Sequence, residues 1–363
     1  MLKKMQHPFF ALDKSVCKEN IQKMAEKACQ SDVIFRPHFK THQSIEISQW
    51  FREEGVEKIC VSSLKMAMYF ASAGWSDITI GMPVNINEAD QLSELAKQVN
   101  LNILVSSVEA SLHLVRKMMT PVNFYIEVDA GYHRSGIDSS NKAEISRILA
   151  GTIKSKLTFK GFLSHFGNTY RAASASEILS IYSESLNQLL NLKQHFLHDY
   201  PDLIISIGDT PSCSLTEKFD GVDEIRPGNF VFYDAMQLYL KSCSFNQIAG
   251  VLIAPVLEKN ESKSELLIHG GAIHLSKEFL LQKGGEKIYG LVSKYKNRRW
   301  SYPIENAYVT SISQEHGIVK MPTKEFSTIK LGDELAIIPI HACLTANLMK
   351  EYVTQSGVIQ MMS

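Results

Sequence analysis

The stretch NFYIEVDAGYHRSGI, residues 123–137, joins a mostly apolar run to a loop rich in glycine and charged side chains. The run 123–128 is rich in β-branched and aromatic residues, which is typical of a strand buried on both faces. The loop after it carries Arg134 close to two glycines. Buried strands that end in such loops and lead into helices are the repeating unit of α/β folds.

The same unit recurs on both sides of this stretch. Short apolar runs alternate with amphipathic stretches such as residues 44–54 and 178–198. Eight such units within about 220 residues predict a (β/α)8 barrel of the TIM type, and a doubly wound open sheet is the competing layout. The predicted strands are residues 33–36, 59–62, 78–82, 102–105, 123–128, 159–164, 203–207 and 224–226.

The pattern changes after Tyr233. Strand-like runs are now separated by turn-rich pieces, which predicts a second, mostly antiparallel β domain. We place the barrel at residues 12–240 and the β domain at residues 241–363, and we expect residues 1–11 to join the latter. The strand-like runs of the β domain are residues 249–257, 265–269, 307–311, 317–320 and 335–340.

Composition narrows the class of protein. Lys plus Arg and Asp plus Glu both total 38, so the formal net charge is zero. This balance argues against nucleic acid or a membrane surface bound through bulk charge. The six cysteines are scattered, which is typical of reduced thiols, and neither a signal-peptide pattern nor a membrane-spanning run is found. We therefore expect a cytoplasmic protein that acts on a small molecule.

Unusual polar clusters follow five of the predicted barrel strands. In barrel enzymes the catalytic residues lie at the carboxyl ends of the strands, so this placement is the main evidence for an active site that is independent of any family. The clusters are RPHFKTH (36–42), EVDAGYHRSGI (127–137), SHFGNTY (164–170), IGDTPSCS (207–214) and IRPGNFVFYD (225–234).

The last two clusters suit a phosphate group. Gly208 permits close approach of the backbone, and Thr210 and Ser212 offer hydroxyls. A helix expected to begin near Ser214 would direct backbone N–H groups at an anion, and the turn 228–229 is a second site of this kind. Two ordinary glycine and proline turns are the alternative interpretation.

Lys40 lies just past the end of the first predicted strand, near Arg36, His38 and His42. Cationic neighbours destabilise an ammonium group, and a lowered pKa is what a Schiff-base lysine needs. A solvated loop lysine is the alternative. Together with a phosphate site at the same barrel mouth, Lys40 indicates covalently bound pyridoxal phosphate.

Three further residues are candidates for contacts with such a ring. Arg134 has the geometry to contact the cofactor or a substrate carboxylate, or it forms a structural salt bridge with Glu127 or Asp129. His165 and Tyr170 are candidates to stack on the ring, and a core histidine and a surface tyrosine are the alternatives.

His341 and Cys343 form a candidate metal site near the end of the chain. They are two residues apart in a strand-like run, which predicts that both side chains lie on one face. Imidazole and thiolate together suit Zn²⁺, and two protein ligands leave positions open for substrate. A core cysteine beside a loop histidine is the alternative.

In their order along the chain, these clusters and the late PIHACLT (339–345) resemble the D-serine dehydratase-like and D-threonine aldolase-like enzymes. These are fold-type III pyridoxal phosphate enzymes of the alanine racemase group, and the resemblance spans residues 10–344. It implies a barrel followed by a β domain in a homodimer. It assigns Lys40 to the cofactor covalently, and it implies cofactor contacts by Arg134, Tyr170, Tyr182, Thr210, Gly228 and Asn229 and metal binding by His341 and Cys343.

The second metal position divides this family, because the dehydratases resemble H-x-C with zinc and the aldolases resemble H-x-D with a harder metal. Cys343 therefore favours a zinc-dependent D-serine dehydratase that converts D-serine to pyruvate and ammonia. The alternative is D-threonine aldolase-type cleavage to glycine and an aldehyde. A non-catalytic cofactor-binding protein is a third class, which the long β domain speaks against.

One residue departs from the family pattern. Asp209 stands in the expected phosphate loop at a position where the resemblance implies a small residue such as serine. A carboxylate there should weaken cofactor binding unless it points away or pairs with a cation.

Overall fold

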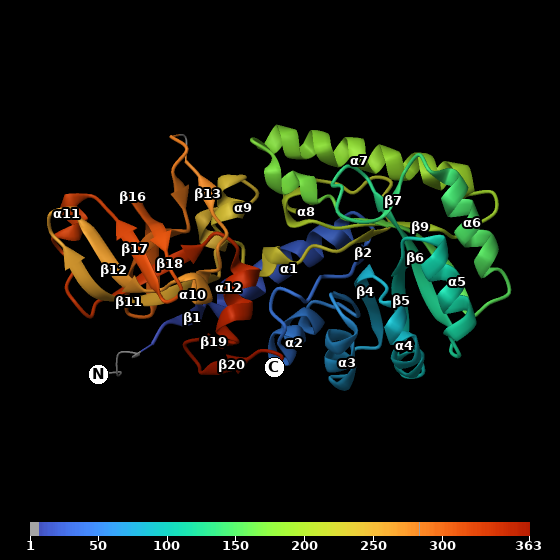
Figure 1. The fold of residues 1–363 in the computed structure, drawn as a ribbon, viewed down its shortest axis with the longest axis horizontal. Coiled ribbons are helices and arrows are strands. Elements are labelled where there is room, and N and C mark those ends of the chain that lie inside the picture. Colours follow the sequence, from blue (N-terminus) through green and yellow to red (C-terminus); the bar gives the residue numbers. More distant parts are fainter. Residues whose placement is uncertain (1–6, 283) are drawn as a thin grey trace. The chain divides into compact units, whose positions relative to one another are not determined.

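The computed structural model describes residues 7–282 and 284–363, and it divides into two compact units (Figure 1). One unit spans residues 21–228. The other combines the N-terminal segment up to Asn20 with residues 229–363. Of the N-terminal residues expected in the β domain, residues 1–6 lie outside the described part of the chain.

The first unit contains one closed sheet of eight parallel strands, in the order β2-β10-β9-β8-β6-β5-β4-β3. A parallel bridge between His38 and Cys60 joins the two ends of this order. The predicted barrel is therefore confirmed, and each predicted strand overlaps an observed one. The strands are β2 (Ile34–Phe35), β3 (Lys58–Val61), β4 (Asp77–Pro83), β5 (Asn100–Val105), β6 (Val122–Asp129), β8 (Leu157–Ser164), β9 (Ile204–Ile207) and β10 (Glu224–Ile225), and β7 (Ile137–Asp138) pairs with β6 outside this order.

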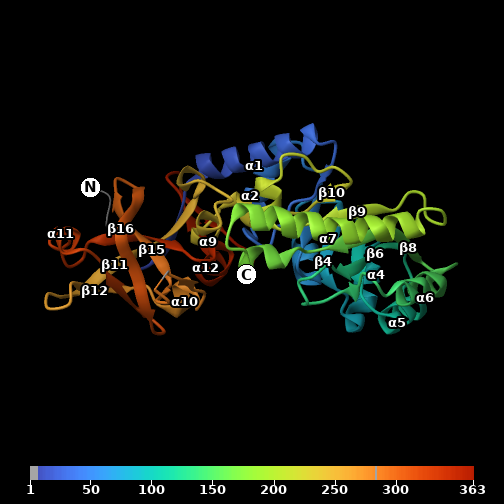
Figure 2. The same ribbon diagram turned by 90° about the horizontal axis from the view of Figure 1, so that it is seen from above.

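Helices connect successive strands of the barrel and lie outside them (Figure 2). Several begin at a residue whose side chain accepts a backbone N–H of the first turn, as Ser63, Ser107 and Ser174 do. The helices are α2 (Ile45–Glu53), α3 (Leu64–Ser72), α4 (Ala89–Leu95), α5 (Val108–Lys117), α6 (Lys142–Thr152), α7 (Ala175–Phe196) and α8 (Thr210–Leu215), with short 3-10 turns η1 (Ile86–Glu88) and η2 (Gly167–Arg171). Helix α1 (Lys14–Gln30) runs from one unit into the other.

The second unit contains a nine-stranded sheet in the order β12-β17-β16-β15-β18-β11-β1-β19-β20. Its pairings are antiparallel except that of β1 with β19, which confirms the predicted mostly antiparallel domain. The strands are β1 (Phe9–Leu12), β11 (Gly250–Asn260), β12 (Glu265–His269), β15 (Gly290–Lys296), β16 (Arg299–Ile312), β17 (His316–Lys320), β18 (Glu334–Pro339), β19 (Glu351–Val353) and β20 (Val358–Gln360), beside a small hairpin of β13 (Leu280–Leu281) and β14 (Lys287–Ile288).

Short helices follow the strands of this unit, and aliphatic side chains such as Leu252, Val292 and Ile337 form its core. The helices are α9 (Ala235–Tyr239), α10 (Ala272–Leu275), α11 (Thr323–Phe326) and α12 (Ala342–Met349), with 3-10 turns η3 (Asn229–Val231) and η4 (Phe245–Gln247). Among the described residues, no disulfide joins any cysteines. None of the described helices is both long enough and apolar enough to cross a membrane.

Candidate active site

Lys40 lies in the turn that closes the barrel. The backbone N–H of Phe39 donates to the carbonyl of Cys60 at 2.8 Å, and that of His38 donates to Pro227 at 2.9 Å. The Nδ1 atom of His38 accepts the N–H of Lys40 at 3.3 Å. These bonds hold the exposed side chain of Lys40 at the carboxyl ends of β2, β3 and β10.

Two residues expected beside Lys40 are engaged elsewhere. The buried guanidinium of Arg36 forms ion pairs with Glu224 at 2.7 Å and Asp77 at 2.5 Å. His42 is buried and stacks on Phe51, with ring centroids 5.4 Å apart, and this burial lowers its pKa to about 3. Both residues therefore stabilise the base of the loop.

His38 and His165 lie among three cations at the ends of the strands. Desolvation lowers the pKa of both imidazoles, and the charges of Lys40, Arg134 and Arg226 lower each of them further, that of His165 to about 3. The Nδ1 atom of His165 bonds to the carbonyl of Gly208. Because a carbonyl only accepts, this nitrogen carries the proton and the Nε2 of His165 keeps a lone pair.

Arg226 is a residue of this site that the sequence did not single out. Its guanidinium is buried, and it donates to Ser206 Oγ at 2.7 Å and to the carbonyl of Ser164 at 2.8 Å. Within the described ranges, no carboxylate lies at ion-pair distance from it. Buried charges in proteins are normally paired, so Arg226 makes the barrel mouth attractive to an anion. In the motif IRPGN (225–229), the sequence pattern indicated a role only for the glycine and the asparagine.

Helix α8 corrects the expectation for the phosphate loop. It begins at Thr210 rather than near Ser214, because Asp209 caps it. One carboxylate oxygen of Asp209 accepts the N–H of Ser212 at 2.7 Å and the hydroxyl of Thr169 at 2.9 Å. The carboxylate thus turns into the first turn of its own helix, and burial raises its pKa to about 6 despite these donors.

Unpartnered hydroxyls line the same loop. In the described part of the chain, the buried Thr210 Oγ1 and Tyr182 hydroxyl have no hydrogen-bond partner, whereas the side chain of Ser212 interacts with Asp209. A Cβ atom on Gly208 would lie 3.0 Å from the carbonyl oxygen of Arg226, and one on Gly228 would lie 2.9 Å from that of His38. Hydroxyl donors beside backbone that is crowded at Gly208 and leaves no room for a Cβ at Gly228 fit the phosphate group of pyridoxal phosphate.

The other ring-contact candidates lie around this loop. The hydroxyl of Tyr170 accepts the N–H of Thr210 at 3.5 Å, and its ring centroid is 6.4 Å from that of His165. Arg134 is exposed, and its guanidinium lies 5.2 Å from the ring centroid of Tyr132.

Arg134 forms no salt bridge with Glu127 or Asp129 among the described ion pairs, although burial raises the pKa of Glu127 and the charge of Arg134 opposes this rise. Glu127 accepts the hydroxyl of Ser135 at 2.8 Å, and Asp129 accepts the Nδ1 of His133 at 3.0 Å. Among the described ion pairs, neither carboxylate is joined to Arg134. The guanidinium is therefore available to a ligand.

The geometric premise for His341 and Cys343 is wrong. Strand β18 ends at Pro339, His341 occupies the cap position of α12, and Cys343 lies within that helix. The apolar run IPIHACLTANL therefore changes from strand to helix at the two candidate ligands. Their common orientation no longer follows from strand alternation, so the metal assignment stays a prediction.

Asp234 connects these residues to the start of η3. Its carboxylate accepts the N–H of Ala342 at 3.0 Å and the amide of Asn229 at 2.6 Å, and that amide lies 3.6 Å from Cys343 Sγ. Burial raises the pKa of Asp234, and the charge of His341 lowers it. Imidazole, thiolate and a supporting carboxylate are a donor set that suits zinc. Asp234 was overlooked although it ends the quoted IRPGNFVFYD cluster.

Two family models match the chain. The alanine racemase N-terminal domain matches residues 12–235, and a putative serine dehydratase domain matches residues 249–355. The D-serine dehydratase of Dictyostelium discoideum is 29% identical, over 93% of this chain and 90% of that protein.

Solved structures share the fold. D-threo-3-hydroxyaspartate dehydratase from Delftia sp. HT23 has a TM-score of 0.90 at 24% identity, covering 99% of this chain and 98% of that chain. A cysteine-to-alanine mutant of D-threo-3-hydroxyaspartate dehydratase in its metal-free form has a TM-score of 0.91 at the same identity and coverage. D-threonine aldolase from Filomicrobium marinum has a TM-score of 0.83 at 20% identity, covering 97% and 92%.

Proposed function

The chain belongs to the alanine racemase N-terminal domain family, and from this membership we propose that it is a D-serine dehydratase that depends on pyridoxal phosphate and zinc. The reaction removes the β-hydroxyl of D-serine and yields pyruvate and ammonia. The similarity to the D-serine dehydratase of Dictyostelium discoideum and the match to the putative serine dehydratase domain support this reaction.

One observation carries the proposal. The barrel mouth gathers Lys40, Arg134 and the buried Arg226, none of them joined to a carboxylate among the described ion pairs, next to the unpartnered hydroxyl of Thr210. This surplus of positive charge and of donors suits a ligand with a phosphate group and a substrate with a carboxylate. Pyridoxal phosphate would supply an electron sink for the Cα carbanion of a bound amino acid, and Lys40 is the residue that would hold this cofactor.

The residues at the barrel mouth are assigned the remaining roles. Lys40 would hold the cofactor covalently, and its amine, when free, is the base proposed for the Cα proton of the D-amino acid. The lone pair on His165 Nε2 is a suitable acceptor for the ammonium of Lys40, because the neutral imidazole adds no charge. Arg134 and Arg226 hold anionic groups, and Tyr170, Tyr182, Thr210, Gly228 and Asn229 are assigned to cofactor binding.

His341 and Cys343 are proposed to hold the zinc ion, which supplies Lewis acidity for departure of the β-hydroxyl. Asp234 accepts the N–H of Ala342 between them and so fixes the start of α12. A related dehydratase whose cysteine mutant was solved in a metal-free form supports a thiolate ligand in this family. The homodimer, the cytoplasmic location and the limits of the two domains stay predictions.

The products of the reaction test the proposal. The purified protein is incubated with D-serine, with D-threonine and, as a control, with L-serine, and its absorption spectrum and metal content are measured. We expect pyruvate and ammonia from D-serine, no turnover of L-serine, and the long-wavelength absorption of lysine-bound cofactor. Glycine from either D-amino acid would instead indicate the aldolase reaction, and a colourless protein that takes up no cofactor would contradict the proposal.

A further inference from the structure

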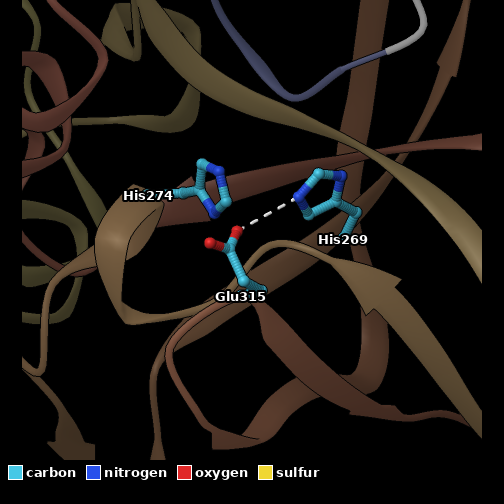
Figure 3. A group of neighbouring side chains, drawn as sticks. All are labelled: His269, His274 and Glu315. Carbon is cyan, nitrogen blue, oxygen red and sulfur yellow. Dashed lines mark hydrogen bonds and ion pairs between the residues drawn. The ribbon is translucent and has the colours of Figure 1, made fainter.

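A second group of potential metal ligands lies in the β unit, separate in sequence from His341 and Cys343. His269 ends β12, His274 lies in α10, and Glu315 lies in the turn between β16 and β17 (Figure 3). All three side chains point toward one another. We propose that they form a binding site for a divalent cation of the zinc class, and this inference does not depend on the proposed reaction.

The distances suit such an ion. One ligand atom from each residue lies within 4.8 Å of the others, and His269 Nε2 is 3.3 Å from Glu315 Oε2. Ligand atoms that each bind a tetrahedral Zn²⁺ at about 2.0–2.1 Å lie about 3.4 Å from one another. One pair already has this spacing, and the third atom would need to move closer to complete the site.

The chemistry of the donors points the same way. Two imidazoles and one carboxylate are a common ligand set of catalytic zinc, with the fourth position open to water. The Nδ1 of His274 accepts the N–H of Gly271 at 3.3 Å, a long hydrogen bond that an ion bound at this nitrogen would replace. His274 is 9% exposed, whereas the side chains of His269 and Glu315 are 28% and 43% exposed, which leaves an entry path from solvent.

A simple ion pair accounts for less of the arrangement. His269 alone would satisfy Glu315, yet the ring of His274 stands perpendicular to that of His269 with centroids 5.2 Å apart. Burial lowers the pKa of His274, and the charge of His269 lowers it further, although Glu315 opposes both effects. Two protonated imidazoles would repel each other here, whereas one shared cation binds both in their neutral form.

The backbone preorganises the three ligands. The N–H groups of Gly270, Ala272 and Ile273 donate to the carbonyls of Glu315, Ser313 and Gln314 at 3.0, 2.8 and 3.1 Å. The loop that carries His274 is therefore bonded along its length to the turn that carries Glu315. Sites held in this way lose little entropy when they bind a metal.

The site also adjoins the helix that carries Cys343. Helix α10 contacts α12, and the hydroxyl of Thr345 donates to the carbonyl of Leu275 at 3.5 Å. An ion bound by His274 would hold α10 in place and so support α12. The two metal sites of the β unit would then stand on neighbouring helices.

Metal content of the full-length holoenzyme tests the inference. The protein is stripped with a chelator, reloaded with Zn²⁺ and analysed by mass spectrometry. We expect about two zinc ions per chain in the wild type and about one in His274→Ala and in Glu315→Gln. His316→Ala is the matched control, because this exposed histidine pairs with His269 across β12 and β17 and should leave the metal content unchanged.

Cobalt loading separates the two sites. Co²⁺ bound by Cys343 gives a thiolate charge-transfer band, which His269, His274 and Glu315 cannot produce. We expect His274→Ala to lose one ion and keep this band, and Cys343→Ser to lose the band and keep one ion. A wild type whose full metal content survives in both His274→Ala and Glu315→Gln would overturn the inference. A single wild-type ion lost only in those two variants would support it and contradict the assignment of His341 and Cys343.

Discussion

The barrel and the β unit both gather ligand-type side chains, but they do so by different means. In the barrel, each polar cluster follows its own strand, and parallel strands bring all these ends to one edge. In the β unit, His269 and Glu315 meet although they are 46 residues apart, because β12 pairs with β17 in a register that sets His269 opposite His316. Order along the chain thus determines proximity in the barrel, whereas strand register determines it in the β unit.

The largest expected effect is in the barrel, where Lys40→Ala tests whether the strand ends form an active site. We expect kcat/KM for D-serine to fall by at least about 10³-fold, because both the covalent attachment and the proton-abstracting amine are lost. The long-wavelength absorption should disappear with it. Lys142→Ala, which removes an exposed lysine at the start of α6, is the control and should leave the rate unchanged. Full turnover of D-serine by Lys40→Ala would contradict any catalytic role for this site.

In the β unit, the comparison is tested by a substitution that removes none of the proposed metal ligands. A Cβ on Gly271 would lie 2.5 Å from the carbonyl oxygens of Ser313 and Gln314, so Gly271→Ala must separate the two ligand-bearing loops. We expect the free energy of unfolding in urea to fall by about 3 kcal/mol. The variant should also lose the ion of the second metal site.

Gly284→Ala is the matched control, since an added Cβ there meets no atom within 4 Å. Its stability should change by less than about 0.5 kcal/mol. If Gly271→Ala unfolds at the wild-type urea concentration and keeps its metal, the loops are not held as described.

The smallest expected effect is the pH dependence of the stability of the barrel. The folded-state pKa of Asp209 is raised from 3.8 to about 6, so stability is lost as pH rises from about 4 to about 6, where the folded protein must bury a charge. Asp209→Asn keeps an acceptor for Ser212 and Thr169. We therefore expect the cofactor-free variant to be more stable than the wild type by up to about 3 kcal/mol at pH 8 and to show no gain at pH 4.

Denaturation at both pH values measures this difference. Equal stabilisation at pH 4 and pH 8 would show that the gain does not come from the charge of Asp209. A loss of stability at pH 8 would show that the carboxylate forms a favourable charge interaction, with Arg226 as the nearest candidate.

These contrasts explain what the sequence allowed us to predict. The eight barrel strands were recognisable because each is a short apolar run between helical patterns, and their polar ends pointed to the site. Strand β15 (Gly290–Lys296) was missed because GLVSKYK contains few apolar residues, and β1, β19 and β20 are too short to show a period.

Residues that depend on tertiary packing could not be predicted in the same way. The run containing Cys343 is mostly apolar, and such a run does not distinguish a buried strand from a buried helix. Arg226 stood out only once its lack of a carboxylate partner was visible. The proximity of His269, His274 and Glu315 depends on the register of the strands, including bulges in β11 and β16. The spacing of residues along the sequence does not reveal this register.

The closure of the barrel predicts the order in which its parts fold. The turn that carries Lys40 is held on one side by Cys60 and on the other by β10, where Ile34 pairs with Glu224. A ribosome completes Lys40 long before it has made the last strand, so the turn around Lys40 can form only after nearly the whole barrel has been synthesised. In refolding, the amides of His38 and Phe39 should gain protection from exchange together with those of β10, as one of the last steps rather than one of the first.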